Sequence, residues 1–225
     1  MKLAALFSGG KDSVYAMYKL RNKHKIACLV TLKPKRSDSY MFHYPNIELT
    51  KVQAKLMDIP IIFRLTAGQK EKELMDLKKA LQEAKKKYKI KGVVAGAIAS
   101  SYQKMRVEKI CKELKLKPFS PLWEVDQEKY LEKLYKDKFE IIICGIAAYG
   151  MTKDFLAKRI DKELIKKLRR INEDFPINFS GEGGEFESLV LNCPLFNKRI
   201  KVKRGNILME NEYTGRYTIK EIEVV

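Results

Sequence analysis

A short stretch near the N-terminus, FSGGKDS, combines glycines with the polar groups that bind phosphate. It lies between an apolar run, LAALF, and a segment with a helical pattern, so it would form a strand-to-helix turn, where backbone N–H groups attract anions. Gly9 and Gly10 remove Cβ atoms that would keep a phosphate at a distance, and they permit a positive φ. Lys11 adds a positive charge, which we expect in a solvent-facing loop. Two hydroxyls can donate hydrogen bonds, those of Ser8 and Ser13.

This pattern differs from the commoner phosphate-binding motifs. The motif GxxxxGK[ST] would need other residues at Ala5 and Asp12, and GxGxxG does not match either. SGGxDS after a first strand resembles the PP-loop ATP pyrophosphatases, the adenine-nucleotide α-hydrolase group. Members of that group split ATP between the α and β phosphates, leaving AMP on an acceptor and releasing pyrophosphate. The resemblance implies ATP as substrate and Mg²⁺ as cofactor, with Asp12 as the metal ligand, since Mg²⁺ suits a carboxylate plus phosphate oxygens.

A second stretch, GEGGEFESLVLNCPLF at 181–196, sets closely spaced glutamates into a glycine-rich loop. Three glycines would permit a sharp turn: Gly181, Gly183 and Gly184. Three carboxylates are unexpected in so basic a chain: those of Glu182, Glu185 and Glu187. Such carboxylates could bind a cation or accept a proton. Alternatively, they are solvated side chains of a turn that leads into a strand at 186–191.

Two further segments are SYMFHYPN at 39–46 and GAIASSYQKMRVEKIC at 96–111. Both would lie at the carboxyl ends of strands, where open α/β sheets bind ligands. Together with the acidic loop, they resemble the archaeal and eukaryotic diphthine–ammonia ligase family over essentially the whole chain. That family amidates diphthine, a modified histidine of translation elongation factor 2 that bears a carboxylate, to diphthamide. The resemblance therefore implies an AMP-forming carboxylate–ammonia ligase that consumes ATP and ammonium and acts on translation elongation factor 2.

The phosphate motif, the places of the other segments at the ends of strands and the resemblance together predict three groups of site residues. Catalytic roles are expected for Lys11, Asp12 and Glu185. Contacts with the nucleotide are expected from Ser8, Gly9, Gly10, Lys11, Asp12, Ser13, Gly96 and Leu32, the last beside the adenine. Contacts with the substrate are expected from His43, Ser100, Tyr102, Gln103, Arg106, Glu182, Gly183, Gly184 and Glu187. In this family's reaction, the acidic loop could bind ammonium, take its surplus proton or face the quaternary ammonium of diphthine.

Two other functions stay open. A tRNA-modifying PP-loop enzyme would use the same ATP chemistry and would suit the positive charge. Its thiolating members would be expected to use paired or catalytic cysteines, whereas the 4 cysteines here are scattered without a CxxC pair. We expect Cys111 and Cys144 to be buried hydrophobic residues. A nucleotide-binding regulator without turnover would keep the phosphate site but would not need the acidic loop.

The first half of the chain alternates between strand and helix. Short apolar runs predict strands at 2–7, 26–32, 59–63 and 92–97. Helical periodicity predicts helices at 47–57 with Asn46 as cap, at 70–88, and at 102–115 with Ser100 or Ser101 as cap. A short extended piece between Pro118 and Pro121 would add an edge strand. We expect a parallel five-stranded sheet sandwiched by helices, the HUP-like nucleotide domain that the resemblance implies.

The pattern changes near residue 122. Helices are predicted at 126–137 and 161–172 around the strand FEIIICG, and the chain beyond Pro176 is predicted to be β-structure. We therefore expect a PP-loop ATP-binding domain over 1–122. A smaller α+β domain over 123–225 would complete the substrate cleft.

The chain is strongly basic, with 46 Lys and Arg against 28 Asp and Glu, a net charge of +18. Such a charge suits an acidic partner, but much of it lies on the outer faces of amphipathic helices, without interleaved aromatic residues. We expect solvated helix faces rather than a specific nucleic-acid site, and the abundance of Lys and Glu is typical of proteins from hot environments. No apolar run approaches the roughly 20 residues of a membrane span, and no signal peptide is recognisable, so we expect a cytoplasmic protein. A homodimer stays open.

Overall fold

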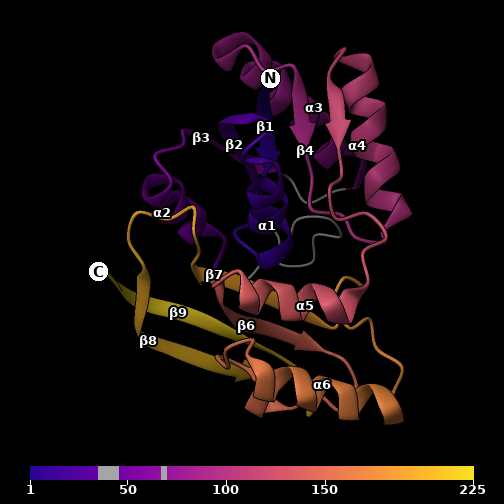
Figure 1. Cartoon of the computed structure of the whole chain (residues 1–225), viewed down its shortest axis with the longest axis vertical. Coiled ribbons are helices and arrows are strands. Elements are labelled where there is room, and N and C mark those ends of the chain that lie inside the picture. Colours follow the sequence, from indigo (N-terminus) through magenta and orange to yellow (C-terminus); the bar gives the residue numbers. More distant parts are fainter. Residues whose placement is uncertain (35–45, 67–69) are drawn as a thin grey trace. The chain divides into compact units, whose positions relative to one another are not determined.

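The computed structural model describes residues 1–34, 46–66 and 70–225. They form two compact units, Met1–Trp123 and Glu124–Val225, and each unit has a sheet of its own (Figure 1). None of the helices in these described ranges is long and apolar enough to cross a bilayer.

The first unit alternates strands with helices. Its elements in chain order are β1 (Lys2–Leu6), α1 (Lys11–Leu20), β2 (Lys25–Pro34), η1 (Ile47–Leu49), α2 (Thr50–Leu56), β3 (Ile61–Thr66), α3 (Lys70–Tyr88), β4 (Gly92–Val94), α4 (Ser101–Glu113) and β5 (Lys117–Phe119). All five strands are parallel, in the order β3-β2-β1-β4-β5. Since β1 is the central strand, the turn that follows it lies at the middle of the edge formed by the carboxyl ends of the strands. The predicted parallel five-stranded sheet is confirmed, with the short piece around Pro118 as its edge strand.

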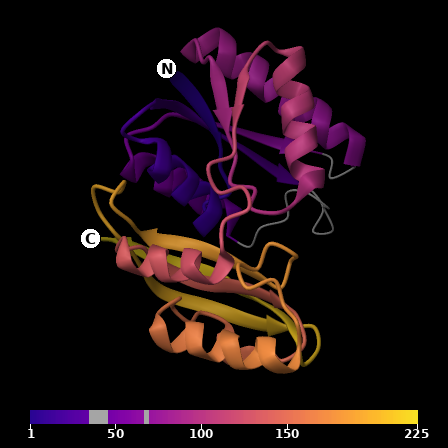
Figure 2. The ribbon, with the colours of Figure 1, turned by 45° about the vertical axis from the view of Figure 1, so that its right-hand side comes forward.

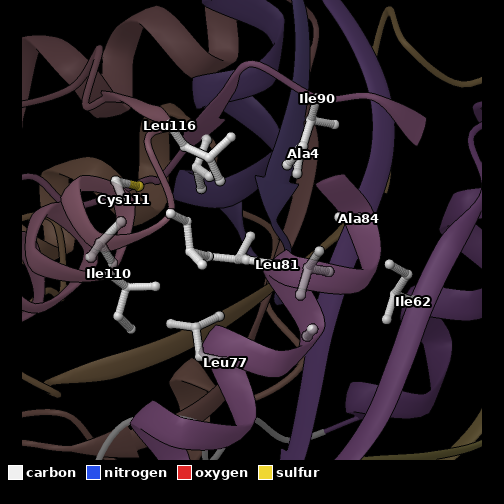
Figure 3. Packing of buried hydrophobic residues seen from close by; sticks show 14 of the residues in the cluster. Ala4, Ile62, Leu77, Leu81, Ala84, Ile90, Ile110, Cys111 and Leu116 are labelled. Carbon is white, nitrogen blue, oxygen red and sulfur yellow. The ribbon is translucent and has the colours of Figure 1, made fainter. Parts of the chain in front are cut away.

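The core of this unit forms where α3 and α4 pack onto one face of the sheet. Leu77, Leu81 and Ala84 repeat at helical spacing along α3, and they lie in one buried cluster with residues of α4 and the strands (Figure 3). Strand side chains that point the other way, such as Leu3 and Leu29, are buried as well. Since α1 lies against β1 and α2 against β3, both faces of the sheet are covered.

The second unit is an antiparallel sheet with two helices. Its elements are α5 (Gln127–Lys136), β6 (Glu140–Ala147), η2 (Lys153–Phe155), α6 (Lys162–Asp174), β7 (Phe186–Asn192), β8 (Ile200–Met209) and β9 (Thr214–Val224). The strand order is β7-β6-β9-β8, and both long helices run alongside the sheet (Figure 2). Arg169 of α6 joins the two helices through its contacts with Glu128 and Glu132 of α5. The α+β class expected for this part is confirmed.

The helix predicted from residue 47 does start at Ile47, but the expected side-chain cap is not formed. Asn46 has a left-handed backbone, with φ +65°, and its side chain caps no N–H of the described residues. The segment begins instead with the short helix η1, and the Thr50 hydroxyl donates to the Ile47 carbonyl where η1 passes into α2. Asparagine tolerates this conformation, and Asn46 occupies the cap position through its carbonyl, which accepts from the Leu49 N–H at 2.9 Å.

Candidate functional site

The turn between β1 and α1 is built around Gly9. This residue has φ +79°, and a Cβ added to it would lie 2.3 Å from Oε1 of Gln53 in α2. The Gln53 Nε2 atom donates to the Gly9 carbonyl at 3.0 Å, and the Gln53 side chain is fully buried. Only glycine can take this backbone conformation so close to a neighbouring side chain. The hydrogen bond from Gln53 therefore fixes the turn to α2.

The two serines of the motif meet across the turn. Ser8 Oγ donates to Ser13 Oγ at 3.2 Å, and Ser13 Oγ donates to the Gly10 carbonyl at 3.1 Å. Gly10 is the residue before the first turn of α1, and within the described residues no side chain caps this end of the helix. An uncapped helix N-terminus with adjacent hydroxyls is suited to binding a phosphate. This local geometry is compatible with the expected phosphate site.

Lys11 and Asp12 form an ion pair at the start of α1. The distance from Lys11 Nζ to Asp12 Oδ2 is 2.9 Å, and the side chains are 2% and 30% exposed. The expectation that Lys11 lies in a solvent-facing loop is wrong, because Lys11 is the first residue of the helix and its stem packs inside the unit. A buried ammonium needs a partner, and here the neighbouring carboxylate supplies one. A bound phosphate could share this charge, which leaves the Asp12 carboxylate available to a cation.

Two further residues expected at the nucleotide have packing roles in the structure. A Cβ on Gly96 would lie 2.6 Å from the Asp12 carbonyl carbon, so this glycine allows the segment after β4 to approach the first turn of α1. Leu32 is 3% exposed and belongs to the hydrophobic cluster of the first unit. Gly96 therefore lies beside the phosphate turn, whereas packing accounts for Leu32.

The residues expected to contact substrate near α4 lie at its first two turns. Ser100 accepts a hydrogen bond from the Gln103 N–H at 3.4 Å, which confirms Ser100 as a cap. The Arg106 guanidinium lies 3.3 Å from the centroid of the Tyr102 ring, a cation–π contact. The Arg106 Nε atom is buried and has no hydrogen-bond partner in the described part of the chain. His43 lies outside the described residues.

The acidic loop of the second unit turns sharply at its glycines. Gly181 and Gly184 have φ of +72° and +95°, so the predicted turn is confirmed. A Cβ on Gly183 would lie 2.6 Å from Oε1 of Glu185, which folds back over the loop and accepts a hydrogen bond from the Asn178 N–H at 2.9 Å. Glu182 and Glu187 are half-buried. In the described ranges, no three or more His, Cys, Asp or Glu side chains gather as a metal site.

The cysteines lie inside the protein. All four are free thiols and buried, as expected for Cys111 and Cys144. Burial raises the pKa of Cys28 to about 12 and that of Cys111 to about 11, because a thiolate is poorly solvated in the core. Cys193 is raised to about 12 for the same reason. A nucleophilic thiolate of the kind a thiolating enzyme needs is therefore disfavoured.

Sequence reasoning missed Gln53 and two residues before the acidic loop, Asn178 and Ser180. Gln53 stands four residues after Leu49 on the inward face of the predicted helix 47–57, and a buried polar residue in such a position signals a specific partner. Asn178 and Ser180 carry no comparable pattern, and only the structure shows that the Asn178 N–H donates to Glu185 and that Ser180 is buried.

Known proteins are similar to this chain along both units. Family models for the diphthamide synthase N-terminal domain and the diphthamide synthase C-terminal domain match residues 1–118 and 126–225. The diphthine–ammonia ligase of Rattus norvegicus is 35% identical over 230 residues, which cover 94% of this chain and 86% of that protein. The diphthine–ammonia ligase of Homo sapiens is 32% identical over 231 residues, with the same coverage of 94% and 86%. The chain therefore belongs to the diphthine–ammonia ligase family.

Proposed function

We propose that this chain is an AMP-forming amide ligase that converts diphthine on translation elongation factor 2 to diphthamide. ATP and ammonium are the co-substrates, and AMP and pyrophosphate are the products. The observation that supports it most is the SGGKDS turn with its uncapped helix N-terminus and buried lysine, in a chain whose relatives are named diphthine–ammonia ligases.

The chemistry needs an activation step, because a carboxylate repels nucleophiles and has no good leaving group. A diphthine carboxylate oxygen attacks the α-phosphorus of ATP, the bond from that phosphorus to the bridging oxygen of the β-phosphate breaks, and pyrophosphate leaves. Ammonia then attacks the acyl carbon, the carbon–oxygen bond to AMP breaks, and the surplus proton passes to a base. The turn at Ser8–Ser13 stabilises the charge on the departing pyrophosphate through hydroxyls, backbone N–H groups and the Lys11 ammonium.

The residues of the turn fit a Mg²⁺–nucleotide complex. Asp12 offers a partly exposed carboxylate at the helix start, and one carboxylate together with phosphate oxygens is a usual magnesium environment. When bound, Mg²⁺ neutralises phosphate charge. Lys11 binds phosphate, while Ser8 and Ser13 orient it.

The roles of the two units follow from this proposal. The first unit, Met1–Trp123, binds ATP and activates the carboxylate. Contacts with the substrate at the start of α4 come from Ser100, Tyr102, Gln103 and Arg106. The second unit supplies the acidic loop, where Glu185 handles the proton of ammonium. We place the reaction in the cytoplasm, where elongation factor 2 works. The proposal is compatible with a homodimer but does not require one.

The decisive experiment combines the chain with diphthine-bearing elongation factor 2, ATP and ¹⁵N-ammonium. Mass spectrometry of the factor should show one labelled amide at the modified histidine, and chromatography of the spent nucleotide should show AMP and pyrophosphate. Formation of ADP and phosphate would contradict the PP-loop chemistry. The tRNA-modifying alternative would instead be supported by two results together: elongation factor 2 remains unlabelled, and a parallel incubation with tRNA yields a modified tRNA.

A further inference from the structure

Three buried oxygens in the acidic-loop region have no hydrogen-bond partner among the residues that the structure describes. They are Asn178 Oδ1, Ser180 Oγ and Glu185 Oε2. Ser180 is entirely shielded from solvent. Buried polar atoms are almost always hydrogen-bonded, and an unsatisfied one is costly. Asn178 Oδ1 and Glu185 Oε2 can only accept hydrogen bonds, and the Ser180 hydroxyl can accept one as well, so a ligand with hydrogen-bond donors would satisfy all three.

The three residues belong to one closed turn. The Asn178 N–H donates to Oε1 of Glu185 at 2.9 Å, and the Asn178 carbonyl accepts from the Gly181 N–H at 2.7 Å. The Ser180 N–H donates to the side chain of Gln127 in α5, also at 2.9 Å. These hydrogen bonds therefore fix the turn at Asn178 and at Ser180, and the Glu185 carboxylate folds back to Asn178.

The charge of the turn selects the class of ligand. Glu185 forms no ion pair within the described ranges of the chain, and a shielded carboxylate oxygen favours a compensating positive charge. One carboxylate with two neutral oxygens balances a single positive charge. Divalent ions prefer more carboxylate or water ligands, and no group of three or more candidate metal ligands exists in the described residues. A monovalent cation that donates hydrogen bonds meets both requirements.

We propose that this turn binds ammonium through Asn178 Oδ1, Ser180 Oγ and Glu185 Oε2. Ammonium carries one positive charge and N–H groups that can point to three acceptors at once. The inference rests on the proposed function for the use made of the bound ammonium, which loses a proton to Glu185 before it attacks. Asn178 and Ser180 are positioning residues that hold the ion, and Glu185 both holds it and accepts its proton.

The first test measures binding without turnover. Thermal unfolding of the full chain is followed in NaCl, KCl and NH₄Cl at constant ionic strength. A ligand that binds only the folded state raises the unfolding temperature in a saturable way, so NH₄Cl should raise it above the values in NaCl and KCl. An equal rise in KCl would overturn the assignment to ammonium, and no rise in NH₄Cl would overturn the site.

The Ser180→Ala variant separates a cation from an ordered water. Removing a hydroxyl without a protein partner should leave the unfolding temperature in NaCl unchanged or higher, because no protein hydrogen bond is lost. The dissociation constant for ammonium should rise about tenfold, the usual effect of losing one hydrogen bond to a charged ligand. If the variant is equally destabilised in NaCl and NH₄Cl, the oxygens bind a structural water and the inference is wrong.

Kinetics of the amidation provide an independent readout. Asn178→Ala and Ser180→Ala should each raise the KM for ammonium about tenfold while kcat at saturating ammonium and acceptor-dependent pyrophosphate exchange into ATP stay near wild type. Glu185→Gln should lower amide formation by about 10²-fold or more, the range for losing a general base, while exchange persists. Asn211→Ala, in the exposed turn between β8 and β9, is the matched control and should change none of these values.

The outcomes distinguish the site from the proposed function. A saturable ammonium effect that Ser180→Ala weakens, in a chain that does not amidate diphthine, would support the site and contradict the function. Amidation with an unchanged KM for ammonium in both alanine variants would support the function and contradict the site.

Discussion

Single residues determine the chemistry of the phosphate turn, and the packing around them determines which substitutions the turn can accept. Gly9 is confined by Gln53, and Ser8 and Ser13 bond to each other across the turn. Lys11 is almost entirely buried and paired with Asp12. The lysine is thus both a phosphate ligand in the proposed function and part of the interior, and replacing it has two separable effects.

We expect Lys11→Ala to weaken ATP binding about ten- to a hundredfold. The lost contact between a charged donor and phosphate corresponds to about 1.5–3 kcal/mol. Because the side chain is buried, the alanine variant should also unfold at a lower temperature than the wild type. Lys11→Met, which keeps most of the volume, should lose ATP affinity to a similar degree but retain more stability. Isothermal titration with ATP and thermal unfolding measure the two effects, and unchanged ATP affinity in both variants would contradict the phosphate site.

The helices position the predicted site residues, and three of them begin after a capping side chain. Ser100, Asp126 and Asp161 each accept a backbone N–H at the start of α4, α5 and α6. The hydrogen bond from the Lys129 N–H to the Asp126 carboxylate lowers the pKa of Asp126. A carboxylate with a lowered pKa in the folded state stabilises the fold above its unfolded-state pKa and loses that contribution as the pH falls through the folded-state value.

The cap of α5 therefore gives a pH-dependent prediction. Asp126→Ala should lower the unfolding temperature near pH 7, where the wild-type carboxylate is charged, because an N-cap acceptor is lost. The difference between wild type and variant should shrink as the pH falls below the ordinary range of an aspartate, roughly 4. Asp126→Asn keeps a neutral cap and is the control, so it should lose less stability at pH 7 than the alanine variant. If wild type and Asp126→Ala differ in unfolding temperature by the same amount near pH 7 and below roughly pH 4, the charged form of the cap does not contribute to stability.

The chain carries a strong net positive charge, and some of its lysines are paired with glutamates of the same chain. Lys33 and Lys51 both bind Glu48, and Lys78 binds Glu113. These pairs are half-exposed, and such pairs contribute little to stability individually. These half-exposed pairs support the expectation that the charged helix faces are solvated. The excess positive charge on such faces attracts anions in general and gives no specificity for one of them.

Nucleic-acid binding should accordingly be weak and unspecific. We expect tRNA to bind at low salt and to dissociate as the salt rises, since a complex with about six phosphate contacts loses roughly 10³-fold in affinity between about 50 and 200 mM salt. Fluorescence anisotropy with tRNA and a duplex of unrelated sequence, at both salt concentrations, measures this. Tight binding that persists at the higher salt and prefers tRNA would contradict the expectation and favour a tRNA substrate.

The sequence by itself determined the class of fold and the type of chemistry. Alternating apolar runs and helical periodicity depend on local steric and hydrophobic preferences, so they predicted the parallel sheet, and the glycine–serine–lysine spacing predicted the phosphate turn. Only the tertiary structure decided the burial of Lys11, the contact of Gln53 with Gly9, the packing role of Leu32 and the meeting of Asn178 with Glu185. These depend on contacts between residues distant along the chain or on how an irregular loop folds, and neither leaves a periodic signal in the sequence.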